Sequence, residues 1–248
     1  MAGEREEILI PGSGRQAVLL LHGLFGTPNE LHVLGGALSA DGHTVLIPLL
    51  PGRGARGSDM DALSWDDWMG AALGAFDRLA RDHDRVAVGG LSAGGTMALD
   101  LALRRPVAAL MLYAAALSLR LRAAYLAPYL WRVVRPWRSP RTSAGDPVRM
   151  RAVAELVRGM RRVRPRLAEI EAPALVMHAA RDPFVPSANA HELARRLGGQ
   201  VELVIVGGAA HAITAGVGRD DVARRTRLFL DPSRAPRHPV SANASRDR

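Results

Sequence analysis

The feature that most constrains the fold is a short apolar run at residues 86–91 that ends at Ser92 and resumes directly behind it. The first run has the length of a buried strand, whereas residues 96–103, apolar except for Asp100, have the character of a helix packed into a core. Almost nothing separates these two elements, so the turn between them must be very tight. Gly90 and Gly94 flank the serine, and glycine allows such a turn because it has no side chain to obstruct neighbouring backbone. We therefore predict a strand, a sharp turn that carries Ser92, and a helix.

Ser92 at this turn has the surroundings of a nucleophile. A serine at a helix N-terminus lies beside free backbone N–H groups and the positive end of the helix dipole, and both favour a developing oxyanion. Gly-x-Ser-x-Gly between a strand and a helix is a known pattern, the nucleophile elbow. The pentapeptide alone is also compatible with a glycine-rich turn that has no chemistry. The strand before it and the helix behind it favour the elbow.

Strand and helix patterns alternate over most of the 248 residues. This alternation is typical of an α/β fold, with a mostly parallel, doubly wound sheet that helices cover on both faces. The predicted strands are residues 8–10, 17–21, 43–47, 86–91, 107–114, 174–179 and 201–206. The predicted helices are residues 28–40, 64–82, 96–103, 187–197 and 220–230, with Ser64 as the N-cap of the second.

The alternation stops between residues 117 and 168. This segment has helical apolar spacing that prolines interrupt, and it predicts a small helical insertion that forms a cap. The α/β core then consists of residues 1–116 and 169–230. Residues 231–248 are rich in Pro, Ser, Ala and Arg and have little to pack, so we expect a disordered tail.

The predicted cap carries the whole charge excess of the chain. The formal net charge is +9, and all 33 basic residues are arginines. Thirteen of them lie in residues 117–168 against only Asp146 and Glu155, so this segment is +11 and the remainder is −2. A nucleotide-composition bias also produces an arginine-only chain, so the choice of arginine is not itself evidence for phosphate binding.

Three interpretations of this basic segment stay open. Its helices pair apolar stripes with cationic faces, which is typical of a surface that rests on anionic lipid headgroups. The segment also carries four aromatic residues that suit such a surface, Tyr125, Tyr129, Trp131 and Trp137. In the second interpretation the apolar stripes cover a pocket and the arginines form its solvated face, and in the third the charge attracts an acidic carrier or a phosphorylated thioester substrate. Nucleic-acid binding is not expected, because no recognised binding motif accompanies the charge.

The sequence gives no sign of secretion or membrane insertion. It has no cysteine, so neither a disulfide framework nor thiol chemistry is available. The acidic start of the chain lacks the basic and apolar regions of a signal peptide, and no apolar stretch reaches the length of a membrane span. We therefore expect a soluble cytoplasmic protein.

A serine nucleophile needs a base that accepts its proton, and His211 is the predicted base. In an open α/β sheet, functional groups collect on loops behind the carboxyl ends of strands. His211 follows the strand at residues 201–206 on a loop of small residues. His22 also ends a strand, but the adjoining Gly23 suggests that it shapes its own loop.

The base in turn needs an acid that orients it, and Asp182 is the predicted acid. It follows the strand at residues 174–179. A turn-forming aspartate before a proline is the alternative, because that arrangement is common. The chain order Ser92, Asp182, His211 is the order known for a nucleophile elbow and its partners, so the three candidates support one another.

A tetrahedral intermediate also needs two hydrogen-bond donors for its oxyanion. The backbone N–H of Ala93, directly behind the nucleophile, is the first predicted donor. The glycine-punctuated loop at residues 22–26 follows an earlier strand and supplies the second, for which we predict the N–H of Leu24.

At this point the sequence resembles the α/β-hydrolase superfamily, and more narrowly its small bacterial carboxylesterases and monoacylglycerol lipases. The resemblance spans residues 8–230 in register, and its motifs are residues 20–26, 50–54, 90–95 and 180–186 together with His211. It implies hydrolysis of carboxylic esters with small or medium-length acyl chains through an acyl-serine intermediate. It also implies a short helical cap over a hydrophobic acyl pocket, and neither a metal nor an organic cofactor.

Three positions depart from the pattern of the superfamily. Leu24 replaces a frequent aromatic residue, Arg53 replaces the histidine usual in the Pro-Gly-x-Gly loop, and Ala93 replaces a common methionine. These changes leave the chemistry intact and leave the substrate open. Alternatives on the same scaffold are a thioesterase or acyltransferase that uses the same triad, and a non-catalytic binding protein.

Overall fold

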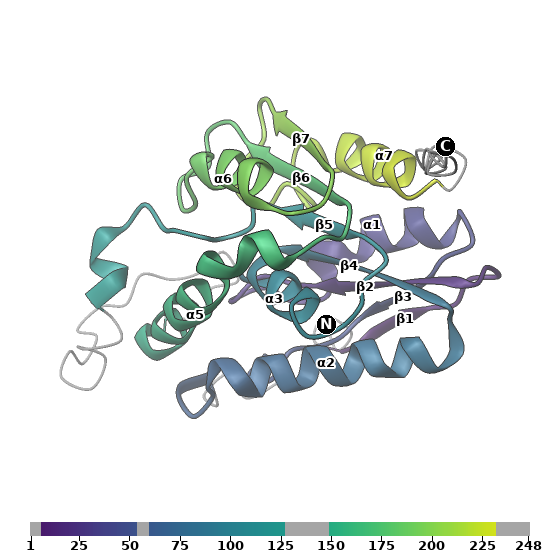
Figure 1. Cartoon of the computed structure of the whole chain (residues 1–248), viewed down its shortest axis with the longest axis horizontal. Coiled ribbons are helices and arrows are strands. Elements are labelled where there is room, and N and C mark those ends of the chain that lie inside the picture. Colours follow the sequence, from purple (N-terminus) through teal and green to yellow (C-terminus); the bar gives the residue numbers. More distant parts are fainter. Residues whose placement is uncertain (1–5, 54–59, 127–148, 232–248) are drawn as a thin grey trace, which may run out of the picture.

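The computed structural model describes residues 6–53, 60–126 and 149–231. Its strands are β1 (Ile8–Ile10), β2 (Gln16–Leu21), β3 (Thr44–Ile47), β4 (Arg85–Leu91), β5 (Leu110–Tyr113), β6 (Ala174–Ala179) and β7 (Val201–Val206). They form one sheet in the order β1-β3-β2-β4-β5-β6-β7 (Figure 1). β1 pairs antiparallel with β3, and the other neighbouring pairs are parallel. The predicted α/β fold with a mostly parallel sheet is confirmed.

Helices cover both faces of this sheet (Figure 1). On one face lie α1 (Asn29–Ser39) and α7 (Arg219–Leu230). On the other lie α2 (Trp65–Asp82), α3 (Ala93–Ala102), α5 (Met150–Val163) and α6 (Ala188–Arg196). Two short 3₁₀ helices, η2 (Arg122–Leu126) and η3 (Arg164–Glu169), precede and follow α5 in the chain. None of the helices in the described ranges combines the length and the apolar content that crossing a bilayer requires.

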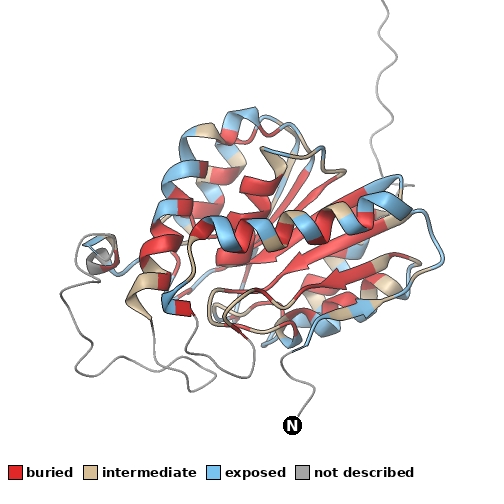
Figure 2. Cartoon of the chain, turned by 90° about the horizontal axis from the view of Figure 1, so that it is seen from below, coloured by how far each residue is buried: buried red, intermediate tan, exposed pale blue. Residues whose placement is uncertain are grey.

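Strand β2 shows how the sequence builds two cores at once. Residues 17–21 are fully buried, and successive side chains of a strand point to opposite faces. Leu19 and Leu21 therefore pack in the core beneath α2 and α3, whereas Val18 and Leu20 pack beneath α1. Figure 2 shows this distribution, with buried residues along the strands and exposed residues on the outer surfaces of the helices.

The local predictions agree closely with the observed elements. Ser64 is the N-cap of α2, as predicted, and its Oγ accepts a hydrogen bond from Asp67 N while the Asp67 carboxylate accepts one from Ser64 N. β5 is shorter than the predicted strand at residues 107–114, because a bend at Ala108 precedes its regular part.

The last helix of the predicted insertion, α5, packs against α2 and α3. The contact is close, since a Cβ atom at Gly159 would lie 2.5 Å from the ring of Trp65. Residues 127–148, which include much of the predicted cap, lie outside the described residues, as do residues 232–248 of the predicted tail. The division into core, cap and tail therefore stays a prediction.

Candidate active site

The three predicted catalytic side chains follow three different strands. Ser92 follows β4, Asp182 follows β6, and His211 follows β7. Since these strands are parallel, their carboxyl ends meet at one edge of the sheet. This edge is where functional groups collect in open α/β sheets.

Ser92 lies on a strained turn between β4 and α3. Its backbone has φ 56° and ψ −114°, a conformation that L-residues rarely adopt and that costs on the order of 1–3 kcal/mol. The turn is held by a 2.8 Å hydrogen bond from Ser92 N to Tyr113 O. A side chain at Gly90 would overlap the backbone of Gly94, and one at Gly94 would overlap Leu21 O. Glycine is therefore required at both positions, for the steric reason that the sequence suggested.

Asp182 and His211 form the central contact of the site. Their atoms Oδ2 and Nδ1 are 2.6 Å apart. A carboxylate can only accept, so the imidazole donates from Nδ1, and in the neutral ring Nε2 is left as the acceptor. A neutral imidazole with a free Nε2 is the form that a general base requires.

The carboxylate of Asp182 is fixed from its other side by backbone. Its Oδ1 accepts hydrogen bonds from Phe184 N at 2.8 Å and from Val185 N at 2.9 Å. Burial raises the pKa of Asp182, but the hydrogen bond and charge of His211 and the two backbone donors outweigh it, so the pKa lies below its ordinary value. The carboxylate is therefore charged at neutral pH and can stabilise a protonated imidazole.

The ring of His211 is partly exposed and contacts Phe184 edge to face, with centroids 5.4 Å apart. Ser92 is partly exposed as well. Within the described residues, Ser92 Oγ makes no hydrogen bond to His211. Hydrogen bonds between catalytic groups are often long before substrate binds, so this separation does not argue against a base role.

The two predicted oxyanion donors lie on neighbouring segments. A side chain at Gly23 would come within 3.9 Å of Ser92 Cβ, which places the loop at residues 22–26 beside Ser92. In that loop Gly26 N donates to Gly23 O at 3.0 Å and closes a tight turn. Neither Leu24 N nor Ala93 N has a hydrogen-bond partner among the described residues. Both groups thus have the free N–H that an oxyanion requires.

His22 shapes the start of this loop, as its neighbouring glycine suggested. The ring is fully buried and lies between two backbone groups, since Nδ1 donates to Gly23 O at 2.8 Å and Nε2 accepts from Leu50 N at 3.1 Å. Burial lowers the pKa of His22 to about 4. The imidazole is therefore neutral at physiological pH and has no free nitrogen for catalysis.

The structure also adds residues that the sequence did not single out. His178 is buried 3.5 Å from Asp182 Oδ2 and donates from Nε2 to Val185 O at 3.1 Å, and burial lowers its pKa. Arg120 donates from Nε to the backbone carbonyl of Asp182 at 2.7 Å. Both residues support the loop that carries the acid. No local pattern marks them, because each acts through a segment distant in sequence or through its burial.

Two other features bear on what the site contains. The described residues include no group of three or more His, Cys, Asp or Glu side chains that could hold a metal ion. A cavity of about 830 Å³ lies at the opposite edge of the sheet, where Gln16, Arg85 and Val201 begin their strands. That cavity is separate from the candidate active site.

Comparison with known proteins gives matches along nearly the whole chain. A family model described as "Alpha/beta hydrolase family" matches residues 18–225. The chain is 27% identical over 228 residues to the thermostable monoacylglycerol lipase of Bacillus sp. (strain H-257), and the match covers 88% of this chain and 91% of the relative.

Solved structures show the same fold. The metagenome-derived lipolytic enzymes LipS and LipT provide one similar structure, with a TM-score of 0.84 at 23% identity over 92% of this chain and 97% of that chain. The monoacylglycerol lipase of Paleococcus ferrophilus is another, with a TM-score of 0.74 at 20% identity over 90% of this chain and 97% of that chain.

Proposed function

The chain belongs to the alpha/beta hydrolase family, as a hydrolase of the lipase and esterase type, and from this premise we propose that it cleaves carboxylic esters through an acyl-enzyme on Ser92. The observation that carries the proposal is the 2.6 Å contact between Asp182 and His211 at the same sheet edge as the strained turn of Ser92. A binding protein would not need a serine held at a cost in strain at the same sheet edge as a carboxylate–imidazole pair.

The reaction proceeds in two halves. In the first, Ser92 Oγ attacks the acyl carbon and its proton passes to His211 Nε2, while Asp182 stabilises the imidazolium. The bond between the acyl carbon and the alcohol oxygen then breaks, and His211 returns the proton to the leaving alcohol. In the second half, water attacks the acyl carbon, gives its proton to His211 and releases the acid, and Ser92 regains its proton.

The negative charge of each tetrahedral intermediate is stabilised by the N–H groups of Leu24 and Ala93. The removal of one such donor costs about 3–4 kcal/mol of transition-state stabilisation. A backbone donor cannot be deleted by ordinary substitution, so the direct tests must address the triad.

For the substrate, we propose esters with small or medium-length acyl chains, including monoacylglycerols. The match to a monoacylglycerol lipase over most of both chains supports this class. The exposed Phe184 beside His211 provides an apolar surface at the site, which suits an acyl chain.

The test is a profile of activity on p-nitrophenyl esters from acetate to palmitate and on monoacylglycerols. We expect wild type to hydrolyse these esters and to be labelled by a fluorophosphonate, whereas Ser92→Ala loses at least about a thousandfold in kcat and is not labelled. Ser13→Ala, an exposed serine in the turn before β2, is the matched control and should keep full activity.

Two outcomes would contradict the proposal. Equal turnover by wild type and Ser92→Ala would reject the nucleophile. Faster turnover of acyl thioesters than of oxygen esters, or acyl transfer to an added alcohol in preference to water, would favour the thioesterase or acyltransferase alternative on the same triad.

A further inference from the structure

We propose that Arg53 and Glu30 are positioning residues that hold the turn at residues 23–26 from opposite sides and thereby present Leu24 N–H to the oxyanion. The proposal rests on the function proposed above, because the oxyanion forms only if Ser92 attacks the carbonyl carbon of a substrate. It gives a role to Arg53, one of the three positions at which the sequence departs from the pattern of the superfamily that it resembles.

Arg53 holds the second half of the turn by its carbonyl groups. Its Nε donates to Gly26 O at 2.9 Å, and one terminal nitrogen donates to Phe25 O at 2.7 Å. The residue is only 2% exposed, although a buried guanidinium is costly unless it is hydrogen-bonded. One planar group thus fixes two consecutive peptide units directly behind Leu24.

Glu30 holds the first half of the turn by an amide group. It lies in the first turn of α1, and its Oε2 accepts a hydrogen bond from Gly23 N at 3.3 Å. A side chain at Gly26 would overlap the Glu30 carboxyl group, so this carboxyl group fills the space inside the turn. A larger residue at this position would displace the carboxyl group from the turn.

Together these contacts bind the N–H and C=O groups of Gly23 and Gly26 and the carbonyl of Phe25. Gly23 N is bound by Glu30, Gly23 O accepts from His22 and from Gly26 N, and the carbonyls behind Leu24 are bound by Arg53. Leu24 N is left without a partner in the described part of the chain. The turn cannot rotate to satisfy this N–H internally without breaking the contacts on both sides.

The electrostatics of the two residues are complementary. Burial raises the pKa of Glu30 above its ordinary value, and the Gly23 N–H group and the charges of His211 and Arg53 offset only part of that rise. A carboxylate beside the nucleophile would by itself repel a developing oxyanion. The guanidinium of Arg53 offsets that charge, and we therefore expect the two residues to act as a pair.

The experiment compares Arg53→Gln, Glu30→Ala and Glu30→Gln with wild type. The matched control is Arg104→Gln, which removes a partly buried arginine that pairs with Asp100 away from the site. Active sites are titrated with a fluorophosphonate so that kcat refers to folded enzyme. The inhibition constant of a trifluoromethyl ketone, which forms an oxyanion on Ser92, and amide hydrogen exchange of the peptide at residues 22–31 are measured on the same samples.

We expect Arg53→Gln to lower kcat about tenfold to a hundredfold, with KM within about threefold of wild type, and to weaken inhibition by the ketone by the same factor. Glu30→Ala should also lower kcat and weaken inhibition by the ketone. Glu30→Gln should keep both values near those of wild type, because its amide oxygen still accepts from Gly23 N. Exchange at residues 22–31 should be faster in Arg53→Gln and Glu30→Ala. Arg104→Gln should lower thermal stability and leave kcat per titrated site unchanged.

Unchanged kcat, ketone inhibition and loop exchange in both Arg53→Gln and Glu30→Ala would overturn the proposal, and lower stability alone would reduce both residues to a structural role. If wild type itself hydrolyses no ester, the proposed function fails instead. In that case the exchange measurement still decides whether the two side chains hold the turn.

Discussion

His22 is a buried imidazole whose two nitrogens are both used by backbone. Burial lowers its pKa to about 4, below the value of 6.5 of an exposed histidine, so the ring is neutral in the folded protein at pH 7. Between these two values the unfolded chain binds a proton that the folded chain does not. The contribution of His22 to stability is therefore complete above about pH 6.5 and is lost as the pH falls toward 4.

We predict that this single residue makes the free energy of unfolding about 2 kcal/mol smaller at pH 5 than at pH 7. The measurement is urea unfolding at both pH values for wild type and His22→Gln. The variant should be less stable at pH 7 but should lack this part of the pH dependence. His43 and His178, whose pKa values are also lowered, are common to both proteins, so their effect cancels in the difference.

A second measurement applies if His22→Gln does not fold. The NMR signals of the His22 ring in wild type should not titrate between pH 7 and pH 5. Titration of this ring near 6.5 would show that its environment is not the dry, doubly bonded one described here.

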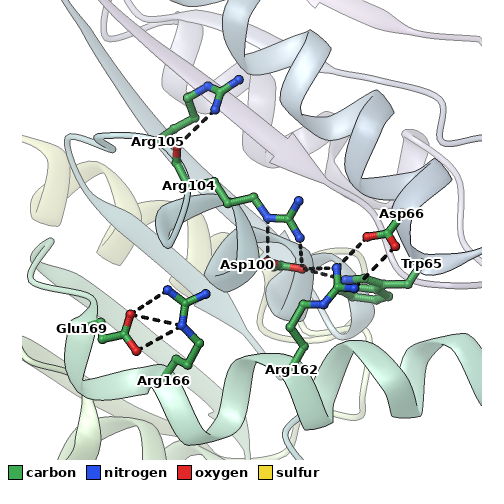
Figure 3. Close-up of polar contacts among 8 residues, drawn as sticks. All are labelled: Trp65, Asp66, Asp100, Arg104, Arg105, Arg162, Arg166 and Glu169. Carbon is green, nitrogen blue, oxygen red and sulfur yellow. Dashed lines mark hydrogen bonds and ion pairs between the residues drawn. The ribbon is translucent and has the colours of Figure 1, made fainter.

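Among the helices, α2, α3 and α5 meet at a buried polar junction (Figure 3). Asp100 of α3 is fully buried, and its carboxylate accepts from the indole Nε1 of Trp65 at 2.7 Å and from Arg104 at 2.9 and 3.1 Å. Trp65 N donates to Glu155 of α5 at 3.1 Å. One residue at the start of α2 therefore joins both neighbouring helices.

We predict that Trp65→Phe lowers the free energy of unfolding more than Trp68→Phe, by about 1–3 kcal/mol, because it leaves the buried Asp100 carboxylate without one of its donors. Both substitutions remove the same volume from a buried indole, and in the described part of the chain the indole of Trp68 donates to the carbonyl of Pro51. Urea unfolding of the two variants measures the difference. Equal losses would mean that packing, and not the hydrogen bond to Asp100, determines the effect.

At the scale of the whole molecule, most arginines at residues 149–166, in and around α5, form ion pairs with carboxylates. In the described residues these pairs are Arg149–Asp61 at 3.1 Å, Arg162–Asp66 at 2.6 Å, Arg164–Glu192 at 2.8 Å, Arg166–Glu169 at 2.6 Å and Arg158–Glu155. Three of them connect the predicted cap region to α2, to α6 and to the segment before α2. The pairs reduce the positive charge that this region offers to an anionic partner.

We therefore predict that the basic segment at residues 117–168 binds weakly, and in a salt-sensitive way, to vesicles of phosphatidylglycerol and phosphatidylcholine. Binding should fall between low and high ionic strength, because exposed charges are screened beyond about 10 Å at 0.1 M salt. Sedimentation with vesicles measures it, with neutral phosphatidylcholine vesicles as the control. Hydrolysis of soluble neutral esters should be nearly independent of salt. Vesicle binding that does not change with ionic strength would show that the arginine charges do not drive it.

The sequence by itself determined the features that depend on neighbouring residues. The buried strands, the N-cap at Ser64 and the sharp turn at Ser92 are all coded by periodicity or by a few adjacent side chains, so each could be predicted locally. The chain order of the elements and the rule that functional groups follow strand ends then brought Asp182 and His211 to the site.

Only the tertiary structure decided the features that join distant segments. β1 precedes β2 in the chain but pairs with β3, because the segment between them crosses the start of β3, where Gly14 N donates to Gly42 O. Arg53 reaches a loop 27 residues earlier, and Trp65 reaches Glu155, 90 residues later. A hydrogen bond across such a separation leaves no periodic pattern in the sequence, so only the tertiary structure shows the contacts that hold the turn at residues 23–26 and the junction of α2, α3 and α5.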